Sequence, residues 1–196
     1  MRQFVVVGHD VPTTPDFPLD ALPSEAGRLD VLCRSVTAAC CLSYDLRRDV
    51  AVHLVLADEF TVHFEASSLR DLHPDERSTA ALVRDALTHR DEAVGHVAAD
   101  AAPGVSISRR GFEGTLSDRE GEVVALTQAG EPPTAAPPPT DPVFVLSDHR
   151  DFTEAEAAVL AERADRRLSL SPAALHADHA VTVAHNYLDT EGFQRY

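Results

Sequence analysis

Charged side chains able to act on a substrate stand close together in the first third of this chain. Arg28, Asp30 and Arg34 fall in a segment whose apolar residues recur at helical spacing. Asp30 and Arg34 are four residues apart, so they are neighbours on one face of a helix. Two interpretations remain open: a substrate-orienting carboxylate between arginines, or a surface ion pair worth only about 0.3 kcal/mol.

The last third carries a second candidate site. Val143–Leu146 and Arg167–Leu170 are short β-like runs, and each leads into a polar turn and then a helical pattern. A turn between a strand and a helix leaves backbone N–H and C=O groups free. Such turns are suited to hold a polar small molecule.

Several familiar chemistries are missing from the sequence. It has no G-x-G-x-x-G loop, no Lys for a Walker A loop and no G-x-S-x-G elbow. Ser147, Asp148 and His149 are adjacent, and adjacent residues rarely point at one another as a catalytic triad does. A metal site is not expected, because the His and Asp residues His176, Asp178, His179 and His185 lack zinc-ligand spacing. The three cysteines, Cys33, Cys40 and Cys41, include no C-x-x-C pair, so they do not indicate a zinc site or a disulfide framework, and Cys33 and Cys40 are expected to fill the core.

Composition limits the class of protein. The chain has 196 residues, a net charge of −15, and no Lys among its 17 basic residues. This pattern indicates adaptation to high salt, where self-repulsion is screened. Acidity therefore does not exclude nucleic acid as a partner. No run is long enough to span a bilayer and the first residues do not resemble a signal peptide, so we expect a cytoplasmic protein without membrane contact.

The elements that must position these residues alternate between strands and helices. Gly8 precedes a long proline-containing loop, His9–Ala26, and a proline-rich connector, Pro132–Pro142, precedes the last third. This order predicts an α/β fold with a largely parallel sheet in one domain, residues 1–196. The expected strands are Arg2–Gly8, Val50–Leu56, Phe60–Glu65, Val105–Ser108, Glu122–Thr127, Val143–Leu146 and Arg167–Leu170; helices are expected from Arg28, after a cap at Asp75, from Thr153 and around Ala180–Leu188.

Six short motifs, in order, resemble one known family. The segments FVVVGHDVPTTPDF, GRLDVLCR, HPDERSTAALVR, VFVLSDHRDFT, RLSLSP and LHADHAVTVAHNYLD occur between Met1 and Asp189. The last three resemble the C-terminal knot region of SPOUT methyltransferases. All six together resemble the archaeal TrmY family, described as tRNA (pseudouridine-54-N1)-methyltransferases.

The resemblance implies a trefoil knot at about residues 143–189, S-adenosylmethionine (SAM) as cofactor, and a homodimer formed through the knot region. Family members often carry Gly at the position of Ser171 and Cys at that of Ala180, so a covalent cysteine is not expected here. The cofactor-binding residues implied are Leu146, Ser147, Ser169, Leu170, Ser171, Leu175 and Ala180.

The same resemblance implies roles for charged residues. Methylation of N1 requires loss of its proton, and Asp30 is the candidate to orient the uracil or take that proton, with Arg28 and Arg34 beside it. Arg77, Arg109 and Arg110 are candidates for phosphate contacts, with the tRNA T-loop as the RNA bound. The alternatives are a SPOUT enzyme acting on a ribose 2′-OH or on rRNA, and a non-catalytic RNA-binding dimer.

Overall fold

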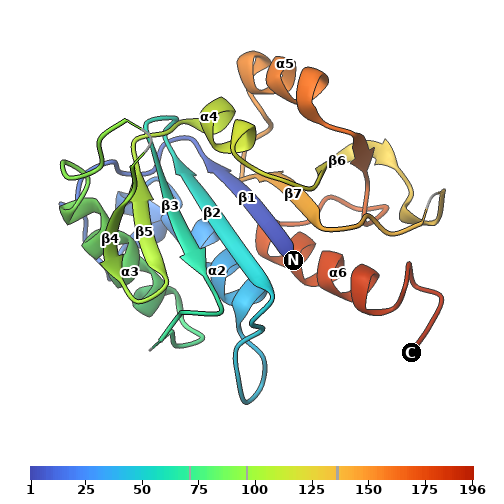
Figure 1. Cartoon of the computed structure of the whole chain (residues 1–196), viewed down its shortest axis with the longest axis horizontal. Helices are drawn as coiled ribbons and strands as arrows, with labels where there is room; N and C mark the ends of the chain where they lie inside the picture. The colour runs from blue at the N-terminus through green and yellow to red at the C-terminus, as the bar shows by residue number, and fades with distance from the viewer. Residues whose placement is uncertain (71, 96, 136) are drawn as a thin grey trace.

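The computed structural model describes residues 1–70, 72–95, 97–135 and 137–196. Its centre is an eight-stranded sheet with the strand order β4-β5-β3-β2-β1-β7-β6-β8 (Figure 1). The elements are β1 (Arg2–Gly8), α1 (Leu22–Glu25), α2 (Leu29–Cys40), β2 (Val50–Leu56), β3 (Phe60–Glu65), α3 (Glu76–Thr88), β4 (Ala99–Ala102), β5 (Val105–Ser108), α4 (Phe112–Ser117), β6 (Glu122–Glu131), the 3₁₀ turn η1 (Pro133–Ala135), β7 (Pro142–Ser147), α5 (Glu154–Arg163), β8 (Arg166–Leu168) and α6 (Ala177–Asp189).

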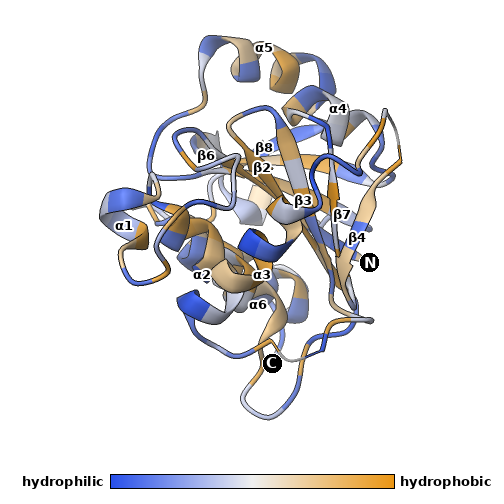
Figure 2. Cartoon of the chain, turned by 90° about the vertical axis from the view of Figure 1, so that its left-hand side faces the viewer, coloured by the Kyte–Doolittle hydropathy of each residue, from blue (hydrophilic) through white to orange (hydrophobic). Residues whose placement is uncertain are grey.

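Strand β1 lies in the middle of the sheet and is covered on both faces. Phe4 and Val6 belong to one hydrophobic core, while Val5 and Val7 belong to the core on the opposite face. Adjacent residues of a strand point to opposite faces, so a continuous apolar run is what a doubly covered strand requires. In Figure 2 the central strands are coloured as hydrophobic, and hydrophilic colour concentrates on the helices and loops outside them.

The sheet is mixed, and its parallel part carries the last third of the chain. Four of the seven strand pairings are parallel: β1 with β2 and β7, and β6 with β7 and β8. The other three, β2–β3, β3–β5 and β4–β5, are antiparallel. The expected α/β class and mostly parallel sheet are confirmed, and the expected strands β2 and β3 pair as an antiparallel hairpin.

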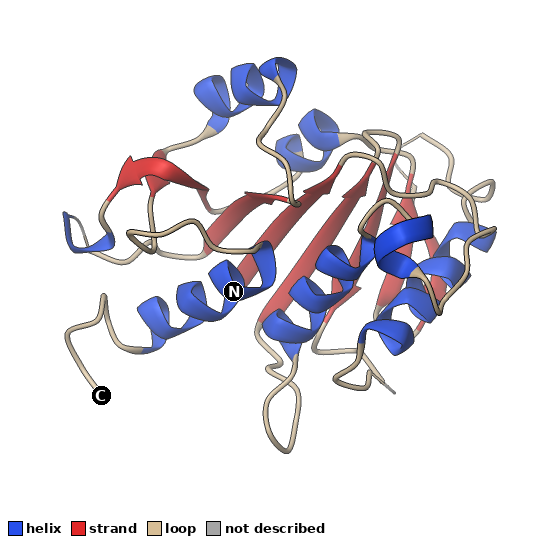
Figure 3. Cartoon of the chain, turned by 180° about the vertical axis from the view of Figure 1, so that it is seen from behind, coloured by secondary structure: helices blue, strands red, loops and turns tan. Residues whose placement is uncertain are grey.

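Helices cover both faces of the sheet. Helices α2, α3 and α6 cover one face, as Figure 3 shows, and their apolar residues join the larger core. Helices α4 and α5 contribute Phe112, Leu116 and Leu160 to the smaller core on the other face. The connection between β7 and β8 therefore runs over one face, and the chain after β8 continues onto the other.

Some local predictions were right and some were wrong. Asp75 caps α3 by accepting a 2.8 Å hydrogen bond from Ser78 N, and Thr153 with Glu156 forms a complete capping box. The expected strand at Arg167–Leu170 is instead Arg166–Leu168, because these are the residues that pair with β6. The strand at Glu122–Thr127 is longer than expected because Glu131 pairs again with Leu168 beyond an irregularity.

Three short elements were not predicted because their sequences have little periodicity. Helix α1 stands inside the expected long loop, β4 carries an Ala-Asp-Ala-Ala sequence, and α4 contains Gly114. The proline-rich connector also begins with η1 rather than as extended chain. Tertiary contacts, rather than local propensity, stabilise such pieces.

The start of α2 is fixed by two consecutive left-handed residues. Gly27 has φ +55° and Arg28 has φ 67°. A Cβ on Gly27 would lie 1.9 Å from Asp10 O, so only glycine fits here. This turn sets the direction in which Arg28 leaves the chain.

None of the helices formed by the described residues combines the length and apolarity that crossing a bilayer requires.

Candidate active site

A cavity lies beyond the carboxyl ends of β7 and β8, against the distal part of β6. We call it the strand-end cavity; its volume is about 640 Å³, within the range of small-molecule sites. Parallel strands end at the same edge of a sheet, which brings their following turns together. Its lining is formed by residues 126–129, 146–152, 168–171, 173–177 and 180.

All of the cofactor-binding residues expected from the sequence line this one cavity. They come from two separate stretches, the end of β7 and the β8–α6 connection with the first turn of α6. The sequence placed these residues in two separate turns, and the structure brings the two turns together. The residues are Leu146, Ser147, Ser169, Leu170, Ser171, Leu175 and Ala180.

Hydrogen bonds of two serine side chains stabilise the loop after β8. Ser169 Oγ donates to Ser171 O at 3.0 Å, and Ser171 Oγ accepts from Ala173 N at 3.2 Å. Ser171 is not among the residues with positive φ. Serine is therefore accommodated without backbone strain where family members often have glycine.

A third wall of the cavity was missed from the sequence. Leu126, Thr127, Gln128 and Ala129 line it from the distal part of β6. Gly130 allows this wall to approach β8, since a Cβ there would lie 2.5 Å from the carbonyl carbon of Leu168. That glycine, three residues after the end of the expected strand, was the available signal of a close backbone approach.

Ser147 provides a direct indication that the cavity accepts a polar ligand. Its Oγ is buried and has no hydrogen-bond partner among the described residues. A buried hydroxyl without a partner costs free energy, so a ligand with a matching polar group would compensate it. Leu146, Leu168 and Leu170 supply apolar lining, which suits a heterocyclic base. The residues present thus fit a nucleoside-containing cofactor.

The charged residues singled out near the N-terminus form a connected group. Arg28 donates to Asp30 through Nε at 2.9 Å and through Nη2 at 3.1 Å. Arg34 Nη1 donates to Asp30 Oδ2 at 2.7 Å. Asp30 is only 2 % exposed, so this is not the solvated surface pair considered above.

Asp30 is held as a carboxylate by its two arginines. Burial alone would raise the pKa of Asp30, but the hydrogen bonds from Arg28 and Arg34 outweigh it and lower that pKa below its ordinary value. A carboxylate stabilised in this way is a weak base. The geometry favours Asp30 as the residue that orients the arginines.

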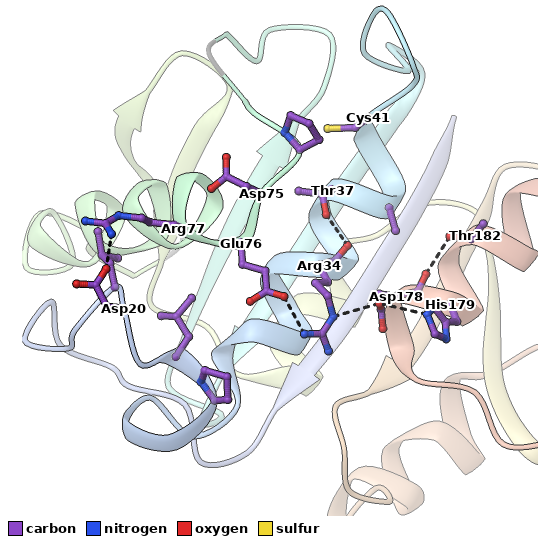
Figure 4. A pocket seen from close by; sticks show the side chains of 15 residues that line it. Asp20, Arg34, Thr37, Cys41, Asp75, Glu76, Arg77, Asp178, His179 and Thr182 are labelled. Carbon is purple, nitrogen blue, oxygen red and sulfur yellow. Dashed lines mark hydrogen bonds and ion pairs between the residues drawn. The ribbon is translucent and has the colours of Figure 1, made fainter.

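Arg34 continues the network to two further helices. Its Nη1 lies 3.0 Å from Glu76 Oε1 on α3, and its Nε lies 3.2 Å from Asp178 Oδ2 on α6 (Figure 4). Asp178 Oδ1 is buried and has no hydrogen-bond partner among the described residues. Neither Glu76 nor Asp178 was predicted, because nothing in their local sequence marks a partner so far away.

A groove of about 720 Å³ lies over this network; we call it the α2–α6 groove. Arg34, Glu76 and Asp178 line it, as does Arg77, whose guanidinium pairs with Asp20. The first turn of α6 separates it from the strand-end cavity, since Ala177 lines the cavity and Asp178 the groove.

The remaining two candidate RNA contacts lie elsewhere. Arg109 and Arg110 follow β5, at the same edge of the sheet but separated from β7 by β3, β2 and β1. Arg109 lies over the Phe60 ring at 4.9 Å and is half exposed, whereas Arg110 pairs with Asp118 and is largely buried. The structure therefore gathers Arg77 with Arg34 but leaves these two apart.

The other candidate residues form neither a triad nor a metal centre within the part of the chain that the structure describes. His149 faces Asp148 at 3.6 Å, but Ser147 Oγ has no described partner to complete a triad. Within residues 1–70, 72–95, 97–135 and 137–196, no group of three or more His, Cys, Asp or Glu side chains is arranged to hold a metal ion. Cys33 and Cys40 are buried, which raises the pKa of both thiols, as expected for core fillers.

The fold is α/β with a mixed sheet, and its strand-end cavity fits a nucleoside. Together with the nearby arginine–carboxylate network, these features indicate an enzyme that uses a nucleoside-containing cofactor. A family model described as "Putative SAM-dependent RNA methyltransferase" matches residues 1–193. A tRNA (pseudouridine(54)-N(1))-methyltransferase of Haloarcula marismortui is 65% identical, with 100% of both chains covered. Proteins of the same name from Haloferax volcanii and Methanocella arvoryzae are 61% and 41% identical; coverage of this chain is 100% and 93%, and of theirs 100% and 96%.

The chain belongs to this methyltransferase family, the TrmY family. A crystal structure of Archaeoglobus fulgidus Nep1 bound to S-adenosylhomocysteine has a similar fold. The structural alignment of the two chains has a TM-score of 0.66 and a sequence identity of 14%, and it covers 97% of this chain and 96% of that one.

Proposed function

We propose that this protein uses SAM to methylate N1 of pseudouridine 54 in the T-loop of tRNA. The observation that carries this proposal is that every cofactor residue expected from the family resemblance lines one cavity with an unsatisfied buried hydroxyl. Membership of the TrmY family supplies the substrate and the position methylated. A tRNA substrate also fits the cytoplasm as its location.

The strand-end cavity would hold SAM among three walls. When bound, SAM supplies an activated methyl group. Leu146, Leu170 and Leu175 would enclose the adenine, while Ser147 and the serines after β8 offer hydrogen bonds to polar edges. Ala180 lines the same cavity and leaves room without a thiol.

The arginine–carboxylate network would position the target base. Asp30 holds Arg28 and Arg34 in fixed directions, and the remaining N–H groups of these guanidiniums can donate hydrogen bonds to a uracil oxygen or a phosphate. Holding N1 against the methyl donor contributes much of the rate acceleration in a transfer reaction. We therefore assign orientation, rather than proton removal, to Asp30, and the proton of N1 would pass to solvent water as the methyl group is transferred.

RNA would approach over the α2–α6 groove. Arg77 and Arg109 are exposed enough to reach phosphates, and Arg110 supports the turn that presents Arg109. The target nucleotide would leave its stack to enter the groove, as is usual for enzymes that modify bases.

We further propose a single SPOUT domain, residues 1–196, closed by a knot at about residues 143–189. The pairing of β8 with β6 is interrupted between Leu126 and Glu131, so residues 127–130 bend around β8. Tyr187 Oη donates to Pro133 O at 3.2 Å, which holds α6 against the proline-rich connector. These contacts place the closing segment beside the distal part of β6 and the turn η1, which supports the proposed knot.

A homodimer through α6 completes the proposal. Thr182, His179 and Asn186 form an exposed strip of α6 beside half-buried Val183. The strip borders the α2–α6 groove, so a second subunit there would add one wall to the proposed base site and leave the groove open to RNA. A dimer would thus contribute to both active sites.

Nucleoside mass spectrometry tests the function directly. Purified protein in multimolar salt is incubated with SAM and tRNA carrying pseudouridine 54, and digests are analysed for 1-methylpseudouridine. A matched tRNA with uridine 54 is the control and should stay unmodified. Methyl groups found on ribose, on another nucleotide or nowhere would reject the proposal in favour of another RNA target or a binding-only protein.

A further inference from the structure

His9 bridges two carboxylates at the rim of the strand-end cavity. Its Nδ1 lies 3.1 Å from Asp148 Oδ1, and its Nε2 lies 3.1 Å from Glu156 Oε2. The backbone N of His9 also donates to Asp148 Oδ2 at 2.9 Å. The side chain is only 11 % exposed, so water does not substitute for these partners.

The two contacts require both ring nitrogens to donate. A carboxylate accepts hydrogen bonds, and a neutral imidazole has a single N–H. The bridge is therefore complete only with an imidazolium. Burial by itself lowers the pKa of His9, but its hydrogen bonds to Glu156 and Asp148 outweigh burial and raise that pKa above the ordinary value.

Both partners shape the segment that forms one wall of the cavity. Asp148 Oδ1 also accepts from Arg150 N at 2.8 Å, and Asp148 N donates to Val7 O at 2.9 Å. Glu156 Oε2 also accepts from Thr153 N at 2.7 Å in the α5 capping box. Residues 148–152, between these anchors, line the strand-end cavity. His9 thus ties both ends of this wall to the end of β1.

We propose that His9, as an imidazolium between Asp148 and Glu156, is a positioning residue that holds the 148–152 wall in its cofactor-binding shape. The inference rests on the proposed function, because it takes SAM as the ligand of the cavity. The charged and titratable groups around the bridge are Asp148, His149 and Arg150 after β7, Glu156 on α5, Asp10 beside His9, and Arg28 at the start of α2.

The test measures SAM affinity by calorimetric titration from about pH 6 to about pH 9, across the range where a histidine with a raised pKa loses its proton. Wild-type affinity should fall as the pH rises. His9→Asn should bind about tenfold more weakly at pH 6, as expected for loss of a charge-assisted hydrogen bond, and show less pH dependence. SAM's own amino group titrates equally with both proteins, so the difference between them is diagnostic.

Two further variants separate positioning from general damage to the fold. Glu156→Gln keeps the capping box, because Gln also serves at this position, and removes only the charge. It should move the pH at which binding weakens to a lower value. Glu154→Gln, an exposed change in the same helical turn, should behave as wild type. In turnover assays His9→Asn should raise KM for SAM and leave kcat at saturation nearly unchanged.

The outcomes are distinguishable. Failure of the wild-type protein to bind SAM at any pH would reject the proposed function itself. Wild-type binding with an unchanged affinity and pH dependence in His9→Asn, or an unmoved midpoint in Glu156→Gln, would reject the role of His9 and leave the function standing.

Discussion

Arg34 and Asp178 join two helices that are 144 residues apart in the chain, through a 3.2 Å hydrogen bond from Nε to Oδ2. The same guanidinium reaches Asp30 and Glu76 through Nη1. This contact connects the network near the N-terminus with the first turn of α6, which also lines the strand-end cavity. The arginine–carboxylate network and the strand-end cavity therefore share one structural support.

Replacing Arg34 by Lys should impair catalysis while SAM still binds. An ammonium cannot reproduce the planar fork that contacts three carboxylates at once. We expect kcat/KM for tRNA to fall about a hundredfold, with little change in SAM affinity, when steady-state rates and calorimetric titrations are compared. Arg195→Lys, at an exposed ion pair with Glu191, is the matched control. Full activity in Arg34→Lys would contradict the proposed role of Arg34 in positioning the target base.

Replacing Asp30 by Asn should lower kcat without reshaping its pH profile. Because its arginines keep the pKa of Asp30 low, the carboxylate is already ionised throughout the working range. Loss of orientation should therefore cost about tenfold or more at every pH. Rates measured between about pH 6 and about pH 9 check this. Activity that recovers steeply at high pH only in the variant would instead identify Asp30 as the proton acceptor.

Replacing Ser147 by Ala should separate stability from cofactor affinity. Its buried Oγ has no described partner, so removing it should leave the ligand-free protein equally stable or more stable. SAM affinity should nevertheless fall about fivefold to tenfold, because the bound cofactor would lose a hydrogen bond. Thermal unfolding and calorimetric titration on the same samples provide both measurements. A variant that is destabilised and binds SAM normally would show a purely structural serine.

Introducing Arg at Thr182 should disrupt the proposed dimer. Thr182 is exposed on α6 and lines the α2–α6 groove, so the change is compatible with a folded monomer but not with a close subunit contact. Light scattering after size-exclusion chromatography in high salt should show a dimer for wild type and a monomer for the variant. Thr88→Arg, exposed at the end of α3, is the control. A monomeric wild-type protein would exclude the dimer.

His185 should make the fold sensitive to mild acid. Burial first, and then the charges of Arg47 and Arg2, lower the pKa of His185 to about 4. Its Nε2 donates to Ala39 O at 3.1 Å, which leaves Nδ1 to accept from Arg2 at 3.1 Å. The neutral ring is therefore the form that the folded state requires.

Proton uptake by His185 decides whether the free energy of unfolding rises or falls with pH. The unfolded chain binds a proton on His185 below about pH 6.5, and the folded chain does so only near pH 4, so stability falls as the pH drops between these values. The loss attributable to His185 is about 3 kcal/mol. Denaturant unfolding at several pH values measures it. His185→Gln should be less stable at pH 7 but flatten this dependence, whereas the exposed His179→Gln should keep it.

The sequence by itself determined the elements with strong local signals. The strand at Arg2–Gly8 and the helix start at Thr153 were predicted, and helical spacing placed Asp30 beside Arg34. Six ordered motifs indicated the family, which the comparisons confirm. These features are local, so they can be read without knowing which segments meet in space.

Only the tertiary structure decided which distant residues meet. It brought the β7 and β8 turns into one cavity, added the unpredicted β6 wall, and placed Asp178 against Arg34 and His9 between Asp148 and Glu156. Such contacts depend on strand order and on the face that each helix covers, which local patterns do not encode. Asp30 shows the difference: its spacing from Arg34 was visible in the sequence, but its burial between two arginines is a property of the fold.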